Sequence, residues 1–127
     1  MTDLPFSRQM LLLGEESQKK LEQSAVLLFG VGGVGSYVAE ALARAGVGRI
    51  TLIDPDEVAL SNCNRQLAAL HSTLGQKKAE VMARRIQDIN PLCQAEPLCL
   101  FYGPETREQI RLQEYDYVVD AIDTVSS

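Results

Sequence analysis

Four short runs rich in apolar residues recur along the chain and predict the strands of a sheet. The first run, residues 25–29, is continuously apolar, which is typical of a strand covered on both faces. The second run, residues 49–54, also has the pattern of a buried strand and ends on a carboxylate. The runs at residues 95–101 and 115–122 predict a third and a fourth strand.

Apolar residues at helical spacing lie between these runs. The segment that follows the first strand repeats apolar positions up to Ala45, and Gly46 ends it. Residues 76–90 predict a clearly amphipathic helix, and residues 15–24 and 105–113 predict two further helices. Near the helix at residues 15–24, three leucines are spaced to form one apolar stripe: Leu12, Leu13 and Leu21.

The order of these elements predicts an α/β fold, a Rossmann-like doubly wound parallel sheet with about four strands and helices on both faces. Such a sheet normally continues beyond its fourth strand, whereas the sequence ends just after residue 122. The outer edge of the fourth strand would then stay long and apolar. We therefore expect residues 1–127 to be the N-terminal portion of one domain, a fragment whose remainder is absent.

Composition narrows the class of protein. The chain has 127 residues, 46% of them hydrophobic and 23% charged, which suits one globular core. A net charge of -5 argues against a surface that coats nucleic acid, although a local basic groove for a folded RNA stays compatible with it. Neither a membrane span nor a signal peptide is recognisable, so we expect a cytoplasmic protein.

Three cysteines without paired spacing suggest buried, reduced thiols: Cys63, Cys93 and Cys99.

A glycine-rich turn follows the first predicted strand. Gly30, Gly32 and Gly35 match the pattern G-x-G-x-x-G, and Gly33 lies within it. Such a turn lets the backbone approach a phosphate closely and points free N–H groups of the next helix at it. Asp54 ends the second strand, where a carboxylate accepts hydrogen bonds from ribose hydroxyls. The pattern predicts a bound nucleotide, and both NAD and ATP fit it.

Charged residues further along the chain favour ATP. Hydride transfer leaves the pyrophosphate of NAD intact, whereas adenylation must stabilise a reacting α-phosphate and a departing pyrophosphate. That chemistry calls for arginine and lysine near the triphosphate, together with magnesium held by a carboxylate. Arg65, Lys78 and Asp123 supply these groups at strand ends or in the loop that faces the glycine turn.

The motifs around these residues resemble the ThiF/MoeB/HesA family, relatives of the ubiquitin-activating enzymes. Three motifs carry the resemblance, which covers essentially the whole chain: D-x-D-x-V-x-x-S-N-x-N-R-Q at 54–66, G-x-x-K at 75–78 and S-R-Q at 7–9. It implies an ATP-binding adenylation domain in which Asp54 binds the ribose. The phosphates would be contacted by Asn62, Arg65 and Lys78, and magnesium would be held by Asp123.

The same resemblance implies further site residues and a partner. The nucleotide-binding set would also include Gly33, Asp56 and Gln66, beside the other glycines of the turn. Arg8 would reach the γ-phosphate of ATP on a partner subunit, which implies a homodimer. With Arg65 and Lys78, Arg8 completes the predicted catalytic set.

Other stretches are similar to one branch of the family, the tRNA threonylcarbamoyladenosine dehydratases. They are residues 68–75, 81–91 and 115–127, and the last contains D-A-I-D-T-V where enzymes that activate sulfur carriers typically have D-x-T-D-N. This branch uses ATP to activate the carboxylate of a threonylcarbamoyl group in tRNA and forms a cyclic product. Residues 7–11, by contrast, resemble the enzymes that adenylate the C-terminal glycine of a small ubiquitin-like sulfur-carrier protein. That alternative stays open, as do a dinucleotide-dependent oxidoreductase and a non-catalytic binding module.

Overall fold

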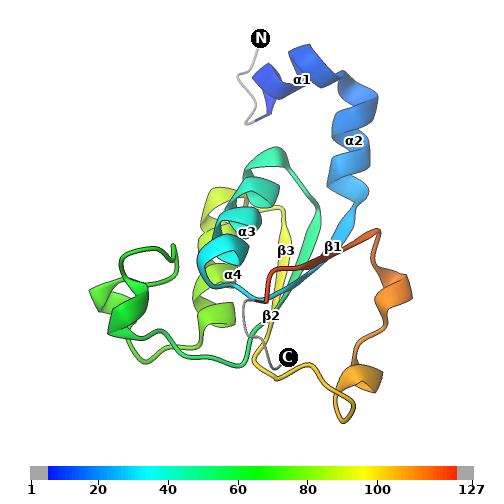
Figure 1. Ribbon diagram of the computed structural model, residues 1–127. Helices are drawn as coiled ribbons and strands as arrows, with labels where there is room; N and C mark the ends of the chain where they lie inside the picture. The colour runs from blue at the N-terminus through cyan, green and yellow to red at the C-terminus, as the bar shows by residue number, and fades with distance from the viewer. Residues whose placement is uncertain (1–5, 123–127) are drawn as a thin grey trace.

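The protein is built around one four-stranded parallel sheet (Figure 1). The computed structural model describes residues 6–122. The strands lie in the order β3 (Gln94–Leu98), β2 (Arg49–Ile53), β1 (Ala25–Phe29) and β4 (Tyr117–Asp120). Parallel strands bring their carboxyl ends to one edge of a sheet, so the segments that follow β1 and β2 meet there. The predicted Rossmann-like α/β class is confirmed.

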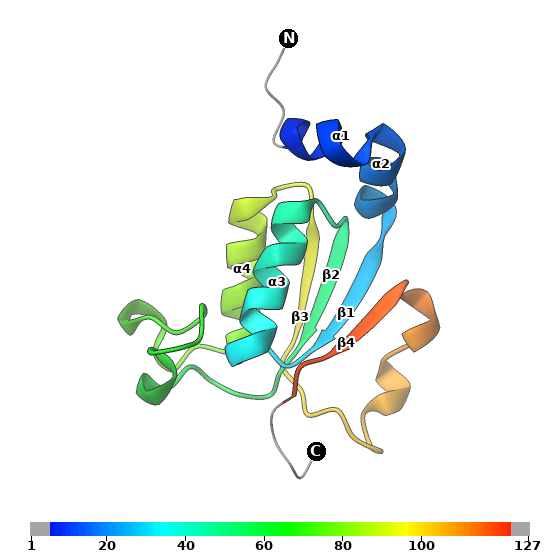
Figure 2. The ribbon, with the colours of Figure 1, turned by 45° about the horizontal axis from the view of Figure 1, so that its top comes forward.

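Two helices cover one face of the sheet (Figure 2). They are α3 (Gly33–Ala45) and α4 (Lys78–Ile89), which lie side by side. The main core forms between these helices and the strands, and its fully buried members include Leu28, Ile50, Leu52, Ala39, Ala43, Met82 and Ile86. Burying such side chains stabilises a fold by roughly 1.5–3 kcal/mol for each of the larger ones.

The opposite face is covered by the segment that joins β3 to β4. The helix predicted at residues 105–113 is wrong, because two short 3-10 helices, η3 (Arg107–Gln109) and η4 (Leu112–Glu114), stand in its place. Between them Ile110 adopts an extended backbone, with φ of -121° and ψ of 120°. Its buried side chain packs in a second core cluster with Leu27, Phe29 and Ile53. Extending the backbone at this residue breaks the α-helical path.

Two N-terminal helices, α1 (Ser7–Leu13) and α2 (Glu15–Gln23), lie at the amino edge of the sheet (Figure 2). Gln9 anchors α1, because its Nε2 donates to the carbonyl oxygen of Ala45 at the end of α3 at 2.7 Å. The predicted leucine stripe is wrong. Gly14 separates the two helices, and Leu12 is 88% exposed whereas Leu21 packs against the main core.

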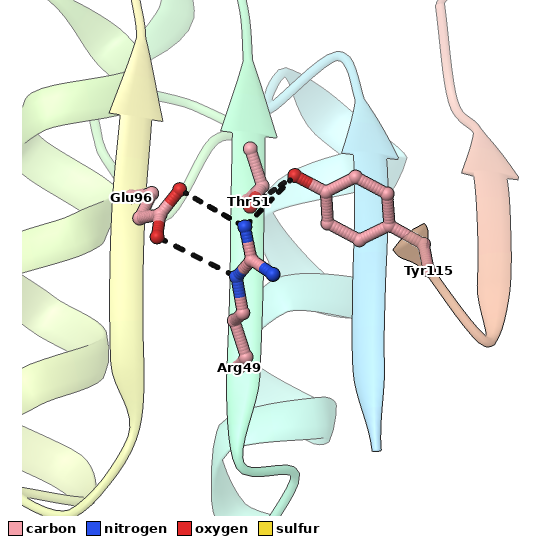
Figure 3. Close-up of polar contacts among 4 residues, drawn as sticks. All are labelled: Arg49, Thr51, Glu96 and Tyr115. Atoms are coloured by element: carbon pink, nitrogen blue, oxygen red, sulfur yellow. Dashed lines mark hydrogen bonds and ion pairs between the residues drawn. The ribbon is translucent and has the colours of Figure 1, made fainter. Parts of the chain in front are cut away.

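A polar cluster ties the β3–β4 segment to the sheet (Figure 3). The hydroxyl of Tyr115 donates to Thr51 Oγ1 at 2.9 Å. The guanidinium of Arg49 lies 5.1 Å from the centroid of the Tyr115 ring, and Arg49 Nε lies 3.4 Å from Glu96 Oε1. These contacts join β2 and β3 to Tyr115, which lies between η4 and β4. They hold the crossover against the face that lacks α-helices.

Both edges of the sheet are exposed. β4 pairs with β1 alone among the described residues, and its Tyr117 and Val118 side chains face solvent. On the β3 side, Cys99 follows the end of the edge strand and is exposed. The expectation of a buried thiol is therefore wrong for Cys99, whereas it is right for Cys93, where burial raises the pKa to about 11.

Replacing Tyr115 by Phe tests the polar cluster. The change removes the hydrogen bond to Thr51 and keeps the ring, so we expect the free energy of unfolding to fall by about 1 kcal/mol. Urea denaturation followed by circular dichroism measures this. The matched control is Tyr117→Phe, at an exposed position, which should change stability by less than about 0.5 kcal/mol. Equal effects of the two changes would contradict the role given to the cluster.

Candidate functional site

The glycine turn links β1 to α3 through close backbone contacts at the carboxyl edge. Gly30 has a φ of +90°, which favours glycine, and its N–H donates to the carbonyl of Ile53 at 2.8 Å. A Cβ at Gly35 would lie 1.8 Å from the carbonyl oxygen of Gly30. The start of α3 therefore sits directly against the turn. Its first N–H groups, which lack partners within the helix, are the groups that attract an anion.

Asp54 joins this turn to the end of β2. It is 5% exposed, its Oδ2 accepts from the N–H of Val31 at 2.9 Å, and its Oδ1 accepts from the N–H of Asp56 at 2.8 Å. An ionised carboxylate offers about four acceptor positions, so two remain for ribose hydroxyls. The predicted ribose ligand thus lies at the expected edge. Asp54 also fixes the glycine turn, and nothing in the sequence indicated this structural role.

Lys78 places a cation in the same region. It is the first residue of α4, it is 6% exposed, and its Nζ lies 3.9 Å from Asp56 Oδ2. Its backbone N–H donates to the carbonyl of Asp56 at 3.0 Å, which fixes the start of the helix beside the loop after β2. At 3.9 Å the ion pair is too long for a hydrogen bond, so the ammonium retains donors for an anionic ligand.

A cavity of about 220 Å³ connects these groups. Six of the predicted nucleotide-binding residues line it: Gly30, Gly32, Asp54, Asp56, Gln66 and Lys78. Its other side is apolar and aromatic, with Phe29, Ile53, Leu100, Phe101 and Tyr102. Phe29 and Tyr102 pack with ring centroids 4.7 Å apart. Sequence reasoning missed this wall, and the only signal for it was that several of these residues end or follow strands.

Other predicted residues lie outside this cavity. Arg65 is exposed, and its Nη1 donates to the carbonyl of Ser61 and to Asn64 Oδ1, each at 3.0 Å. Asn62 is buried, and its Oδ1 accepts from the N–H of Ala59 at 2.9 Å. Neither side chain lines the cavity. Gly33 and Gly35 lie in the first turn of α3 and do not line it either.

The remaining two predicted residues are Arg8 and Asp123. Arg8 is exposed on α1, at the amino edge of the sheet, whereas the cavity lies at the carboxyl edge (Figure 2). Asp123, the predicted magnesium ligand, lies outside the described residues. Within residues 6–122, no group of three or more His, Cys, Asp or Glu side chains is arranged to hold a metal ion. None of the helices described is both long and apolar enough to cross a membrane.

A glycine turn, a buried aspartate and a buried lysine at the carboxyl edge of a parallel sheet are typical of nucleotide-binding α/β proteins. The chain belongs to the ThiF family, whose model matches residues 6–127.

Relatives with known roles are similar over nearly the whole chain. A tRNA threonylcarbamoyladenosine dehydratase of Bacillus subtilis is 54% identical over 120 residues, covering 94% of this chain and 47% of that protein. A crystal structure of the Escherichia coli tRNA N6-threonylcarbamoyladenosine dehydratase in complex with ATP matches with a TM-score of 0.91 and 45% identity, over 95% of this chain and 50% of that one. A sulfur carrier protein adenylyltransferase of Thermus thermophilus is 38% identical, over 93% of this chain and 44% of that protein. The chain spans about half the length of these relatives.

The contact between Gly35 and the glycine turn can be tested by one methyl group. Gly35→Ala would push its Cβ onto the carbonyl of Gly30, so we expect ATP binding to fall at least about 100-fold. Ala41→Ser is the matched control, because it adds one atom to α3 at an exposed position. Isothermal titration calorimetry with ATP measures both variants. The interpretation fails if Gly35→Ala binds as the wild type does, or if Ala41→Ser loses binding to the same extent.

Proposed function

We propose that this chain is the nucleotide-binding part of an enzyme that uses ATP to adenylate a carboxylate. The observation that carries the proposal is the buried ammonium of Lys78, held in one cavity with the glycine turn and Asp54. A departing pyrophosphate needs such a cation, whereas hydride transfer from a nicotinamide does not. The ATP complex of the E. coli relative supports the choice of nucleotide.

The cavity suggests how ATP would lie. Its apolar wall, which includes Phe29 and Ile53, suits the adenine ring, and Asp54 keeps acceptor positions for the ribose. The phosphates would then extend over the start of α3 towards Lys78. Arg65 forms no ion pair among residues 6–122, so turning its side chain towards the phosphates would break only hydrogen bonds to neutral groups.

Magnesium would accompany the triphosphate. Among residues 6–122, the charged residues that line the cavity are two carboxylates, Asp54 and Asp56, and one ammonium, Lys78, so these residues supply little positive charge there. When bound, the ion would neutralise the phosphate charge that builds up as pyrophosphate leaves. The family resemblance assigns it to Asp123, which follows in the sequence directly after Ala121 and Ile122, two residues that line the cavity.

The carboxylate that we propose is that of a threonylcarbamoyl group on an adenosine of tRNA. Its oxygen would attack the α-phosphorus of ATP and release pyrophosphate; a nitrogen of the same group would then attack the activated carbon and release AMP. The support is the 54% identity to the B. subtilis dehydratase, against 38% to the T. thermophilus sulfur carrier enzyme. The C-terminal glycine of a ubiquitin-like sulfur carrier is the alternative substrate. Because we propose a tRNA substrate, we also propose a cytoplasmic location.

A homodimer is part of the proposal because of where Arg8 lies. It is exposed at the edge of the sheet opposite the cavity, so a contact with the γ-phosphate would have to be made in a partner subunit. Beside it, α1 exposes Leu11 and Leu12, which are 86% and 88% accessible. Apolar side chains so exposed on a short helix suit burial in a subunit interface.

Substrate-dependent release of pyrophosphate tests the proposed activity in the full-length protein. We expect release with ATP and tRNA that carries threonylcarbamoyladenosine. Lys78→Ala should lower the rate by roughly 100- to 1,000-fold, as expected for loss of a fixed charge that stabilises a transition state. Lys77→Ala is the matched control, since its side chain is partly exposed and pairs with Glu57 at 3.7 Å.

Three outcomes would contradict the proposal in different ways. Release that requires a small protein ending in Gly-Gly would favour the sulfur-carrier alternative. A change in reduced-nicotinamide absorbance would favour an oxidoreductase. A Lys78→Ala protein with the wild-type rate would show that the proposed triphosphate site is wrong.

Mixing two inactive variants tests whether Arg8 acts across a dimer. In a mixed dimer of Arg8→Ala and Lys78→Ala subunits, one site combines an intact Lys78 with an intact Arg8 from the partner. An equal mixture, after subunit exchange, should recover about a quarter of the wild-type rate of pyrophosphate release. Each variant alone is the control. No recovery in a mixture that contains mixed dimers would exclude a contact made in trans.

A further inference from the structure

Gln66 is a buried polar residue whose partner is missing. Its side chain is 7% exposed and lines the cavity, and its Oε1 accepts no hydrogen bond from any described residue. The backbone around it is fixed, because its N–H donates to the carbonyl of Asn62 and its carbonyl accepts from Ala69, both at 3.0 Å. Leaving a buried acceptor without a donor costs about 1–3 kcal/mol. A molecule in the cavity is expected to supply that donor.

The position of Gln66 limits what the donor can be. The next residue, Leu67, donates its N–H to Ser36 Oγ at 3.2 Å, and Ser36 lies in the first turn of α3. Gln66 therefore lies at the end of the cavity where the phosphates of ATP would be. Phosphate oxygens only accept hydrogen bonds at neutral pH, so they cannot satisfy Oε1. A donor that accompanies the phosphates would satisfy it.

The charges of the cavity point to a hydrated cation. Of the described residues, two carboxylates and one ammonium line the cavity, and these leave the charge of a triphosphate largely unbalanced. Magnesium characteristically keeps several of its waters and uses only one or two protein carboxylates beside the phosphates. The lack of a three-ligand cluster among residues 6–122 agrees with that kind of binding. Water bound to a divalent cation is a strong hydrogen-bond donor.

We propose that Gln66 positions the cation that accompanies ATP by accepting a hydrogen bond from a water molecule bound to that cation. The inference rests on the proposed ATP site. It gives Gln66 a role distinct from that of Lys78, which would meet the phosphates directly. Gln66 would act on the metal–nucleotide complex and leave the affinity for metal-free ATP nearly unchanged.

Calorimetric titration of ATP, with magnesium or with a chelator, tests this in the full-length protein. In the wild type, magnesium should tighten ATP binding. Gln66→Met, which keeps the length of the side chain and removes the acceptor, should reduce that magnesium-dependent gain about 5- to 20-fold. Affinity for metal-free ATP should change by less than about two-fold. Gln87→Met, an exposed position on α4, is the matched control and should behave as the wild type.

A second variant keeps the test decisive if Gln66→Met folds poorly. Gln66→Glu retains an acceptor oxygen, so it should keep or increase the gain from magnesium while it weakens binding of metal-free ATP by charge repulsion. Equal losses of affinity with and without magnesium would mean that the amide N–H₂ contacts a phosphate directly, and would overturn the inference. A full magnesium-dependent gain in Gln66→Met would do the same. If the wild type binds ATP under neither condition, the proposed function fails, and this inference fails with it.

Discussion

The carboxylate of Asp54 holds together the two strand ends on which the site depends. One of its oxygens accepts from Val31 in the glycine turn after β1, and the other accepts from Asp56 in the loop after β2. The bond from Val31 is buried and the bond from Asp56 is partly buried, and a hydrogen bond to a charged group contributes about 1.5–3 kcal/mol. Two loops that are far apart in sequence thus become one rigid edge. The cavity, the start of α3 and the approach to α4 are all built on that edge.

The carboxyl edge holds Lys78 in place at the cavity, whereas Arg65 lies outside the cavity. The N–H of Lys78 is bonded to the carbonyl of Asp56, and the N–H of Val58 to that of Gln76, so the loop after β2 clamps the start of α4. Lys78 is therefore held in place before any nucleotide binds. Arg65 has only exposed bonds to Ser61 and Asn64. A site of this kind combines a preorganised charge with one that nucleotide binding would have to recruit, and only the first needs no rearrangement during the reaction.

The sequence was sufficient to predict what depends on local pattern. The strands and α3 and α4 follow from apolar periodicity. Gly30 and Asp54 meet because parallel strands bring their ends to one edge, and Lys78 joins them there as the first residue of α4. Features that depend on distant packing were not predictable. Ile110 breaks the expected helix because its side chain packs against residues of β1 and β2. The aromatic wall includes Phe101 and Tyr102, which belong to the segment between β3 and β4. The missing partner of Gln66 is likewise a property of the packed cavity, since a residue type in a motif does not reveal which of its atoms lack a bond.

The opposition of the two edges explains why the proposed contact between Arg8 and ATP needs a second subunit. The cavity lies at the carboxyl edge, with the glycine turn, Asp54 and Lys78. Gln9 ties α1 to the C-terminal end of α3, at the amino edge. A helix of 13 residues is about 20 Å long, which is more than an arginine side chain can span. A contact between Arg8 and a nucleotide at this fixed distance therefore requires a second copy of the chain. The same anchoring that prevents Arg8 from serving its own cavity keeps α1 exposed, with its leucines available to another subunit.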